Sequence, residues 1–381
     1  MILGEISEHF FIVIGSEHYN PLGVVRSLGE EGIKPIVIII RGKSRKRVVS
    51  SSKYISRKYF VNDSQEAVDL LITVFGGEKL KPFVFSCDDR TATCLDENYN
   101  KLTERFYFFN AGKEGGLRKF FDKKEIGKLA IKHGLNFLEA VYVQNGEIPD
   151  CLEYPVITKA TNSLVSGWKD EMHICNNEQE LKDAFKQINS SVVMIQKYIV
   201  KKNEYCLEGF SCNKGNTVFI SIQSTYNYTL PMTYSPYMTV NNFDNMNNVF
   251  PSLCEMFKEI GFEGIFEVEF LLTDDDKLFF GEINFRNSTW SYASTCAGMN
   301  LPILWAESMI NNSIDKTIRT EIKKPGFKAM VEFTDFKERV IKRKYSVFRW
   351  IHDLFQCKCK YYIGKHDFKP VLTMLSPFKK R

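Results

Sequence analysis

The sequence predicts an α/β protein that begins with a parallel sheet and continues with mixed sheets. Short β-rich runs alternate with helical patterns through the first third of the chain, as in a parallel sheet with crossover helices. Farther along, neighbouring strand-like runs follow one another as in hairpins. The chain has 381 residues, of which 44% are hydrophobic, so it can bury a large core and form more than one domain.

The first region contains a βαβ unit followed by further strands and helices. Pro21 stands where a helix would begin and Gly32 where it would end, between two runs typical of buried strands. The expected strands are 10–15, 36–40, 82–86 and 105–110, and the expected helices are 20–32 and 64–75. The turn cluster AGKEGG then indicates a domain boundary near residue 115.

The remaining chain changes character twice. A helix over 120–133 leads into a small lobe with the order strand, loop, strand, helix, strand between residues 137 and 198. Hairpin-like strands follow, then a helix over 252–261, and then two strands that are joined by the turn Asp274-Asp275-Asp276. Beyond about residue 320 the sequence becomes basic and loses strand-like alternation. We therefore expect units at 1–115, 116–200, 201–320 and 321–381.

Composition excludes several classes of protein. The 51 basic and 46 acidic residues leave a net charge of +5, which is too mild to predict a nucleic-acid partner. The ten cysteines show no CxxC pair and no signal peptide precedes them, so we expect reduced thiols in a cytoplasmic protein. Cys357 and Cys359 flank one lysine, but two ligands do not complete a zinc site. The longest apolar runs are too short to span a bilayer.

Polar side chains gather on the last two strands of the large lobe. Glu267 and Glu269 are two residues apart and point from one face of their strand. By the same alternation Glu282, Asn284 and Arg286 share a face of the next strand. Carboxylate oxygens are the ligands that Mg²⁺ prefers, and an arginine can stabilise a transferring phosphoryl group. The alternative is a solvated hairpin face with alternating charges.

The run GIFEVEFL followed by KLFFGEINFRNSTWSYASTCAGMNLP resembles the magnesium-binding core of ATP-grasp enzymes, especially the carbamoyl phosphate synthase-like and D-aspartate ligase-like branch. The resemblance implies that Glu269 and Glu282 bridge Mg²⁺ (or Mn²⁺) and that Asn284 completes the metal shell. It also implies that Arg286 steadies the phosphoryl group or an acyl phosphate. Glu267 is a weaker candidate for the same cluster.

Upstream segments resemble other landmarks of that family in the expected order. DKKEIGKLAIKHGL and YPVITKATNS are similar to the segments whose lysines meet the nucleotide phosphates, which implies Lys123 and Lys159 here. VVMIQKYIVKKNEYCLEGF is similar to the hinge between the lobes, where Glu204 would bind the ribose hydroxyls. The residues implied around adenine are Gln196, Lys197, Tyr198 and Ile199. Taken singly, each lysine could equally be an ordinary surface residue.

One segment departs from the family. Many ATP-grasp enzymes carry a glycine-rich loop after the phosphate lysine, whose backbone amides cover the phosphates. In this chain the corresponding residues 161–171, TNSLVSGWKDE, contain a single glycine, Gly167. Hydroxyl groups could share this role, and Trp168 or Lys169 could close over the nucleotide. The hydroxyl groups belong to Thr161, Ser163 and Ser166.

The resemblance implies an N-terminal Rossmann-like domain followed by two lobes that clasp ATP. It implies a ligase that joins a small-molecule carboxylate to an amine, releases ADP and phosphate, and acts alone or as a homodimer without nucleic acid. Two rivals remain: an enzyme that activates bicarbonate to carboxyphosphate or carbamoyl phosphate, and a non-catalytic nucleotide-binding module. The identities of the acid and the amine are not specified.

Three further features have weaker signals. Asp89 and Arg90 follow a parallel strand at the end where open α/β sheets bind ligands, so they could hold an amino-acid-like substrate. The alternative is that Asp88 or Asp89 caps the following helix. His18 follows the first strand at the same edge of the sheet. The basic runs 41–47 and 378–381 could attract phosphate-rich or lipid-linked substrates, or could be solvated loops.

Overall fold

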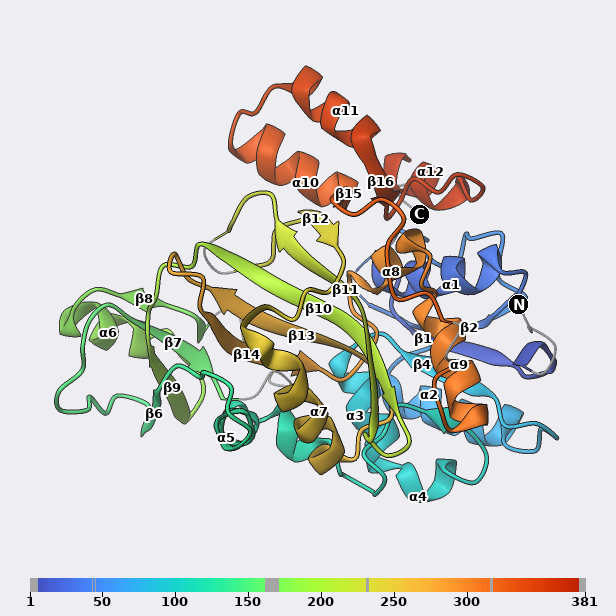
Figure 1. Cartoon of the computed structure of the whole chain (residues 1–381), viewed down its shortest axis with the longest axis horizontal. Coiled ribbons are helices and arrows are strands. Elements are labelled where there is room, and N and C mark those ends of the chain that lie inside the picture. Colours follow the sequence, from blue (N-terminus) through green and yellow to red (C-terminus); the bar gives the residue numbers. More distant parts are fainter. Residues whose placement is uncertain are drawn as a thin grey trace.

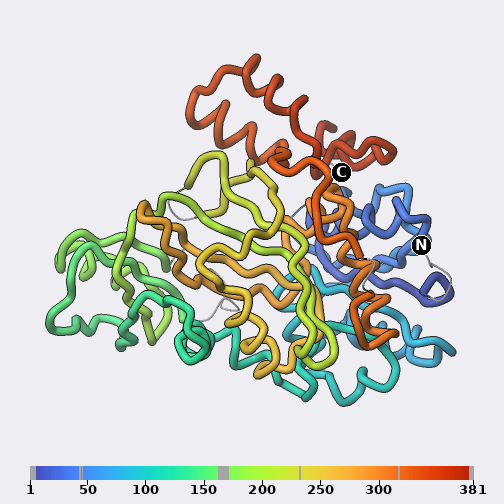
Figure 2. Tube along the Cα trace, viewed as in Figure 1, coloured from blue at the N-terminus to red at the C-terminus, as the bar shows by residue number. Residues whose placement is uncertain are grey.

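The computed structural model describes residues 6–42, 44, 46–161, 171–230, 233–315 and 318–376. Within these ranges the strands form three sheets, which follow the order of the chain from the N-terminal sheet to a small lobe and then a large central sheet (Figure 1). A helical hairpin from the C-terminal segment stands apart from the body of the molecule (Figure 2). The expected α/β fold class is confirmed.

The N-terminal sheet is parallel, with the strand order β3-β2-β1-β4-β5. Its strands are β1 (Phe11–Gly15), β2 (Ile36–Ile40), β3 (Arg57–Val61), β4 (Phe83–Ser86) and β5 (Tyr107–Phe108). Its helices are α1 (Tyr19–Glu30), α2 (Ser64–Leu70) with a π-helical turn at Leu71–Phe75, α3 (Asp89–Glu97) and α4 (Tyr99–Leu102), and a 3-10 turn at Ile6–Glu8 precedes them. Strands β1 and β4 are buried along their whole length because both faces of the sheet are covered.

Two expectations for this sheet need correction. Strand β3 was not predicted, because it is an edge strand whose residues are mostly exposed and therefore carry little apolar signal. The strand expected over 105–110 contains only the two residues of β5, although the aromatic run around it is buried. Burial of an aromatic run is thus not the same as pairing in a sheet.

The small lobe is an antiparallel sheet with the strand order β6-β9-β7-β8. Its elements are β6 (Ala140–Gln144), β7 (Val156–Ala160), β8 (Ile174–Cys175), α6 (Glu178–Phe185) and β9 (Val192–Lys197). The preceding helix α5 (Lys123–Lys132) begins later than expected, because the Asp122 carboxylate accepts hydrogen bonds from the amides of Lys124 and Glu125 and so caps it. A 3-10 turn at Arg118–Phe121 precedes this cap.

The large sheet has the strand order β14-β13-β10-β11-β12-β15-β16. Its first five strands in the chain are β10 (Asn203–Cys212), β11 (Thr217–Tyr226), β12 (Tyr237–Asn241), β13 (Gly264–Leu272) and β14 (Leu278–Asn284). The helices are α7 (Val249–Ile260), preceded by a 3-10 turn at Met246–Asn248, then α8 (Ser291–Ala297) and α9 (Leu301–Asn311). Helix α5 packs against β14 and α7, so its first turn lies beside the large sheet.

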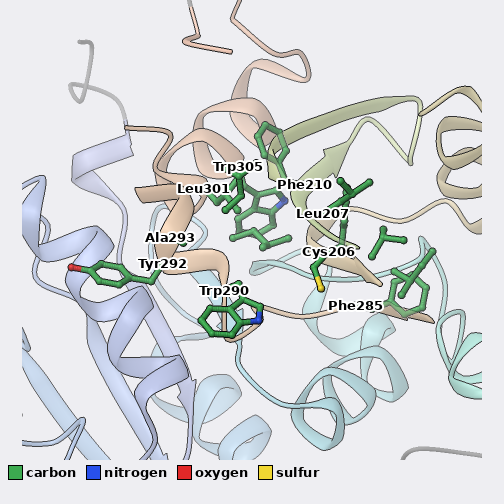
Figure 3. Close-up of a cluster of buried hydrophobic side chains, with 14 of the residues drawn as sticks. Cys206, Leu207, Phe210, Phe285, Trp290, Tyr292, Ala293, Leu301 and Trp305 are labelled. Carbon is green, nitrogen blue, oxygen red and sulfur yellow. The ribbon is translucent and has the colours of Figure 1, made fainter. Parts of the chain in front are cut away.

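A shared aromatic core joins the N-terminal sheet to the large lobe (Figure 3). The ring of Trp305 on α9 contacts the rings of Phe83, Phe85 and Phe109, with centroid separations of 5.9, 5.3 and 4.9 Å. Helices α8 and α9 also pack against α1. These contacts fix the N-terminal sheet beside the strands that carry the acidic side chains.

The expectation that strands end near residue 320 is wrong. Two short strands, β15 (Phe327–Met330) and β16 (Cys357–Lys360), extend the large sheet, β15 antiparallel to β12 and β16 parallel to β15. The other elements are α10 (Glu332–Asp335), a π-helix (Phe336–Lys342), α11 (Val347–Gln356) and α12 (Lys369–Leu375). Each strand has four residues, which is too short for a periodicity to stand out.

The two cysteines of β16 have a structural explanation. Cys357 and Cys359 are buried and Lys358 between them is exposed, which is the alternation of a half-buried strand. No helix in the described part of the chain is long and apolar enough to cross a membrane.

Candidate active site

A pocket of about 350 Å³ lies between the small lobe and the large sheet, and we call it the interlobe pocket. It is lined by the residues that the family resemblance implied for the two phosphate lysines, the hinge and the metal site. These are Lys123, Lys159, Gln196, Lys197, Tyr198, Ile199, Glu204, Glu269, Glu282, Asn284 and Arg286. Residues as far apart in the chain as Lys123 and Arg286 thus converge on one cavity, whereas the expected substrate residues Asp89 and Arg90 do not line it.

Three of the acidic side chains of the pocket, those of Glu267, Glu269 and Glu282, come from the paired strands β13 and β14. Glu267 is opposite Asn284, and Glu269 is opposite Glu282, so the alternation of each strand places all four on one face. The amide nitrogen of Asn284 donates hydrogen bonds of 3.0 Å to both Glu267 and Glu269. The pattern is therefore a connected cluster and not a solvated hairpin face.

The carboxylates of this cluster differ in how readily they ionise. Burial, together with the neighbouring carboxylates, raises the pKa of Glu267 and of Glu269 well above the ordinary value. The Lys123 ammonium lies 3.0 Å from a carboxylate oxygen of Glu282 and lowers the pKa of that group. Burial opposes the charge on Lys123, but Glu282 outweighs it and the pKa of Lys123 is raised. The cluster thus combines an ionised carboxylate with two that resist ionisation.

The donor set suits a hard divalent cation. Two carboxylates and an amide oxygen, from Glu269, Glu282 and Asn284, are oxygen ligands of the kind that Mg²⁺ and Mn²⁺ take, and a cation would relieve the repulsion that raises the pKa of Glu269. In the described part of the chain no three His, Cys, Asp or Glu side chains converge as a complete metal site. The protein would therefore supply a partial shell, with water and substrate phosphates supplying the rest.

Arg286 links this cluster to the N-terminal domain. Its Nη2 donates to the Oδ1 of Asn284 at 2.9 Å, and its Nε donates to the Oδ1 of Asp89 at 2.7 Å. Asp89, at the first turn of α3, therefore orients the arginine instead of lining the pocket. Asp88 caps α3 by accepting from the amide of Thr91 at 2.9 Å, as the alternative interpretation expected, and Arg90 is exposed.

The two predicted phosphate lysines approach the pocket from different elements. Lys123 is the first residue of α5, and its backbone amide donates to the carbonyl of Thr161 at the end of β7. Lys159 lies on β7 and donates to the side-chain oxygen of Gln196 at 2.9 Å. Burial, followed by repulsion from Lys123, lowers the pKa of Lys159 to about 8. Two desolvated ammonium groups close together form a site that favours an anion.

The hinge between the lobes forms the far wall of the pocket. Gln196 donates from its side chain to the carbonyl of Leu138 at 2.7 Å, and the Tyr198 amide donates to the carbonyl of Pro155 at 2.9 Å. Glu204, at the start of β10, pairs with Lys201. The Lys197 ammonium instead turns to Glu153 at the surface, so only the rest of Lys197 faces the pocket.

The sequence missed much of the remaining lining. Ile157 had a signal, since it lies two residues before Lys159 on the same strand face. The other missed residues include Leu138, Met172, Lys201, Tyr226, Thr233, Tyr234, Phe270, Leu271, Thr289 and Trp290. Most of these are apolar or aromatic, as is usual in pockets that enclose a planar ring, and nothing in their local pattern separates them from core residues.

Two earlier expectations concern loops and a lone histidine. Most of the glycine-poor loop lies outside the described residues, including Ser163, Ser166, Gly167, Trp168 and Lys169.

His18 is the N-cap of α1, where its ring nitrogen accepts from the Asn20 amide at 3.4 Å. Burial, followed by the charge of Arg286, lowers the pKa of His18 to about 4, so this ring is neutral at pH 7.

Comparison with known proteins agrees with this architecture. Residues 130–311 match the family model "Carbamoyl-phosphate synthase L chain, ATP binding domain". Among curated proteins the chain is 26% identical over 146 residues to the mitochondrial methylcrotonoyl-CoA carboxylase subunit alpha of Dictyostelium discoideum, a match that covers 35% of this chain and only 20% of that protein.

Solved structures resemble almost the whole chain. N5-carboxyaminoimidazole synthetase from Staphylococcus aureus has a TM-score of 0.66 and 18% identity, with 88% of this chain and 86% of that chain covered. L-amino acid ligase from Bacillus licheniformis has a TM-score of 0.62 and 13% identity, with coverages of 82% and 78%. The biotin carboxylase domain of the Hydrogenobacter thermophilus 2-oxoglutarate carboxylase, solved with MgADP and bicarbonate, has a TM-score of 0.62 and 17% identity, with coverages of 84% and 73%. At these identities the likeness concerns the fold.

Proposed function

Since this chain has the ATP-grasp fold, and its residues 130–311 match the ATP-binding domain of the carbamoyl-phosphate synthase L chain, we propose that it is an ATP-dependent carboxylate–amine ligase. It would form an amide or peptide bond through an acyl phosphate. The observation that carries this proposal is the joint placement of Glu269, Glu282, Asn284 and Arg286 in one pocket with two half-buried lysines.

ATP would lie along the interlobe pocket. The apolar wall and the hinge from Gln196 to Ile199 would enclose adenine, and Glu204 would accept hydrogen bonds from the ribose hydroxyls. Lys123 and Lys159 would bind the phosphates. Burial and the repulsion between the two lysines lower the pKa of Lys159, and a bound anion would relieve that repulsion. Proteins with this fold have been solved with ADP and with MgADP, which supports a nucleotide as the ligand.

Magnesium held by Glu269, Glu282 and Asn284 would neutralise charge on the transferring phosphate. The protein's own contribution is to hold the reacting groups and stabilise the developing negative charge. In the first step a carboxylate oxygen of the substrate attacks the γ-phosphorus, and the bond to ADP breaks. In the second the amine attacks the carbonyl carbon of the acyl phosphate, phosphate leaves, and the amine loses a proton.

Arg286 suits both steps. Its guanidinium is held by Asp89 and Asn284 at the mouth of the acidic cluster, where one edge is fixed and its charge faces the pocket. A positively charged group that is already oriented needs no reorganisation when negative charge develops, which is the main source of such stabilisation. Asp89 is therefore proposed as a positioning residue.

A bicarbonate-activating enzyme is the second candidate. It is favoured by the carboxylase that matches in sequence and by the carboxyaminoimidazole synthetase and biotin carboxylase structures with the same fold. The chain spans only 20% of the matched carboxylase subunit, however, and the amino acid ligase has an equally similar fold. A non-catalytic module is less well supported, because burying several carboxylates without a cation is unfavourable.

The test is phosphate release from ATP and Mg²⁺ with a panel of amino acids and amines, in buffer stripped of bicarbonate. A ligase releases phosphate only when a suitable acid is present, and release increases when the amine is added. Release that instead requires bicarbonate and ignores every amino acid would replace this proposal with the second candidate. Glu282→Gln serves as the inactive control, and Asp274→Asn, an exposed acid in the turn of the same hairpin, as the matched active one.

A further inference from the structure

Exposed apolar side chains are concentrated in the C-terminal segment. Fourteen large apolar residues are exposed in the described chain, and eight of them lie between residues 341 and 375. These eight are Ile341, Val347, Phe348, Ile351, Phe355, Phe368, Leu372 and Leu375. Single exposed apolar residues are common on protein surfaces, but a contiguous group marks a surface that meets something else.

Helix α11 has an apolar face that no other element of the described chain covers. Phe348, Ile351 and Phe355 are three and four residues apart and therefore share one face, and the two phenylalanines are 86% and 80% exposed. The adjacent face is anchored to the protein by Trp350, whose ring nitrogen donates to the carboxylate of Asp335 at 2.8 Å. One face of the helix therefore packs against the protein through Trp350, and the adjacent apolar face is exposed to solvent.

The hairpin formed by α10, the π-helix and α11 is firmly built, so the bare face is not a frayed end. Asp335 is buried and also accepts from the hydroxyl of Tyr228 at 2.8 Å and from Arg339 at 2.9 Å. Arg339 in turn pairs with Asp353 of α11 at 2.6 Å. Figure 1 shows this hairpin standing out from the large sheet, with α11 on its outer side.

The fully exposed charges near this face all have one sign, although Lys342 pairs with the partly exposed Glu338 at 2.7 Å. From residue 337 to residue 376 every charged side chain of the exposed class is a lysine or an arginine, whereas the carboxylates of Glu338, Asp353 and Asp367 are buried or only partly exposed. The exposed cations are Lys337, Lys342, Arg343, Lys344, Arg349, Lys358, Lys365 and Lys369. Lys342 ends the π-helix, and Arg343 and Lys344 follow it in the turn that leads to Val347 and Phe348 at the start of α11.

We propose that this C-terminal surface docks on the headgroup region of an anionic lipid bilayer. An amphipathic helix with aromatic and aliphatic residues on one side and lysine and arginine around it is the chemistry that binds a membrane interface. Phenylalanines would enter the boundary of the acyl chains, and the cations would meet lipid phosphates. The anchoring is peripheral, because none of the described helices could span the bilayer.

A second copy of the chain is a poorer occupant. A twofold contact through α11 would bring this cationic patch, with Lys342, Lys344 and Arg349, against an identical cationic patch. Like charges brought together across an interface oppose association, whereas an anionic bilayer complements them. The charge pattern therefore favours lipid.

The experiment is co-sedimentation of the full chain with vesicles of phosphatidylcholine alone or mixed with phosphatidylglycerol. Wild type should bind the mixed vesicles and not the neutral ones, and should be released by high salt. Replacing exposed cations should weaken binding by about fivefold for each charge, so that Lys342→Gln with Lys344→Gln loses roughly 25-fold. Phe348→Ser with Phe355→Ser should abolish it.

Matched controls carry the same changes elsewhere. Lys34→Gln with Lys79→Gln removes two exposed charges from the N-terminal domain, and Phe60→Ser with Leu80→Ser removes two exposed apolar side chains there. Both should bind like wild type. Equal binding by the α11 variants and these controls would overturn the proposal. Failure of wild type to bind either vesicle would also overturn it. If Phe348→Ser with Phe355→Ser then converted a dimer to a monomer in sedimentation, the occupant of the surface would be a second copy of the chain.

Discussion

The interlobe pocket and the C-terminal hairpin depart in opposite directions from the usual distribution of side chains. In the pocket, the carboxylate of Glu267 is almost completely removed from solvent, and so is that of Glu208 beside it. In the hairpin, Phe348 and Phe355 are almost completely exposed. Charged groups are rarely buried without a partner, and large apolar groups rarely gather at the surface. Both regions are thus incomplete alone, the first without a cation and phosphates, the second without an apolar and anionic surface.

If the two regions have different roles, mutations in them should have different effects. Changes in the pocket should alter chemistry strongly because its charges meet the reacting atoms. Changes on the exposed face of α11 should leave chemistry and stability unchanged and alter only where the protein binds. The predictions below run from the largest expected effect on the pocket to the smallest.

Glu282→Gln should have the largest effect. It removes the carboxylate that is ionised beside Lys123, so we expect turnover to fall by at least about 10²-fold, as for loss of other groups that stabilise transition-state charge. The melting temperature should change little, because the side chain lies at a partly exposed cavity wall. Steady-state kinetics and thermal melting measure the two effects, with Asp274→Asn as the control. Turnover close to that of wild type would remove Glu282 from the metal site.

Lys159→Ala should weaken nucleotide binding and slow the reaction together. Its ammonium would meet phosphates in both the ground state and the transition state, so we expect roughly a tenfold weaker affinity and a lower kcat. Calorimetry with ADP and kinetics with ATP measure these effects. Lys186→Ala, an exposed lysine of the same lobe, should behave like wild type. Unchanged affinity of Lys159→Ala would show that this lysine does not contact the nucleotide.

Asp89→Asn should act through Arg286. The amide still fills the space but no longer balances the guanidinium, so we expect kcat to fall by about tenfold while KM for ATP stays within error. Arg90→Ala, its exposed neighbour, is the comparison variant. A raised KM for acid or amine in Arg90→Ala would restore that residue to substrate recognition, and a normal kcat in Asp89→Asn would end the positioning role of Asp89.

Glu208→Gln should have the smallest effect and is seen only as a function of pH. Burial raises the pKa of Glu208 from 4.5 to about 7, although the hydroxyls of Ser288 and Ser291 oppose the shift. Because the folded protein holds this proton more tightly, the stabilisation is complete below pH 4.5 and is lost as the pH rises to about 7. The loss is about 3 kcal/mol for a shift of this size.

Thermal melts of the nucleotide-free protein across this pH range test the assignment. The decline with rising pH should be shallower in Glu208→Gln than in wild type, whereas Glu255→Gln, an exposed glutamate on α7, should keep the wild-type slope. Equal slopes in all three proteins would mean that Glu208 does not hold its proton in the folded state.

The sequence predicted the parts of this molecule whose signals are local. Alternation along β13 and β14 was enough to bring Glu269 and Glu282 to one face, because the period of a strand is fixed by its backbone. The buried runs of β1 and β2 identified the parallel sheet for the same reason. The family resemblance then supplied expected roles that periodicity alone does not contain.

The features that sequence reasoning missed depend on contacts between distant segments. Strand β15 exists because β12 offers it an edge, and Asp89 serves Arg286 although 197 positions separate them. Trp290 and Tyr234 are ordinary core-like aromatics until the fold brings them to a pocket. The exposed face of α11 was missed because an apolar helical stripe normally predicts burial, and only the structure reveals that one half of it has no partner.

The central claim is that a carboxylate is activated as an acyl phosphate, and trapping with hydroxylamine tests it most directly. The protein is incubated with ATP, Mg²⁺, hydroxylamine and each member of an amino acid panel, and the hydroxamate is quantified beside ADP. We expect one acid or a small group of acids to give hydroxamate in amounts that match ADP, and Glu282→Gln to give none. Formation of ADP that depends on bicarbonate, with no hydroxamate from any acid, would contradict the account.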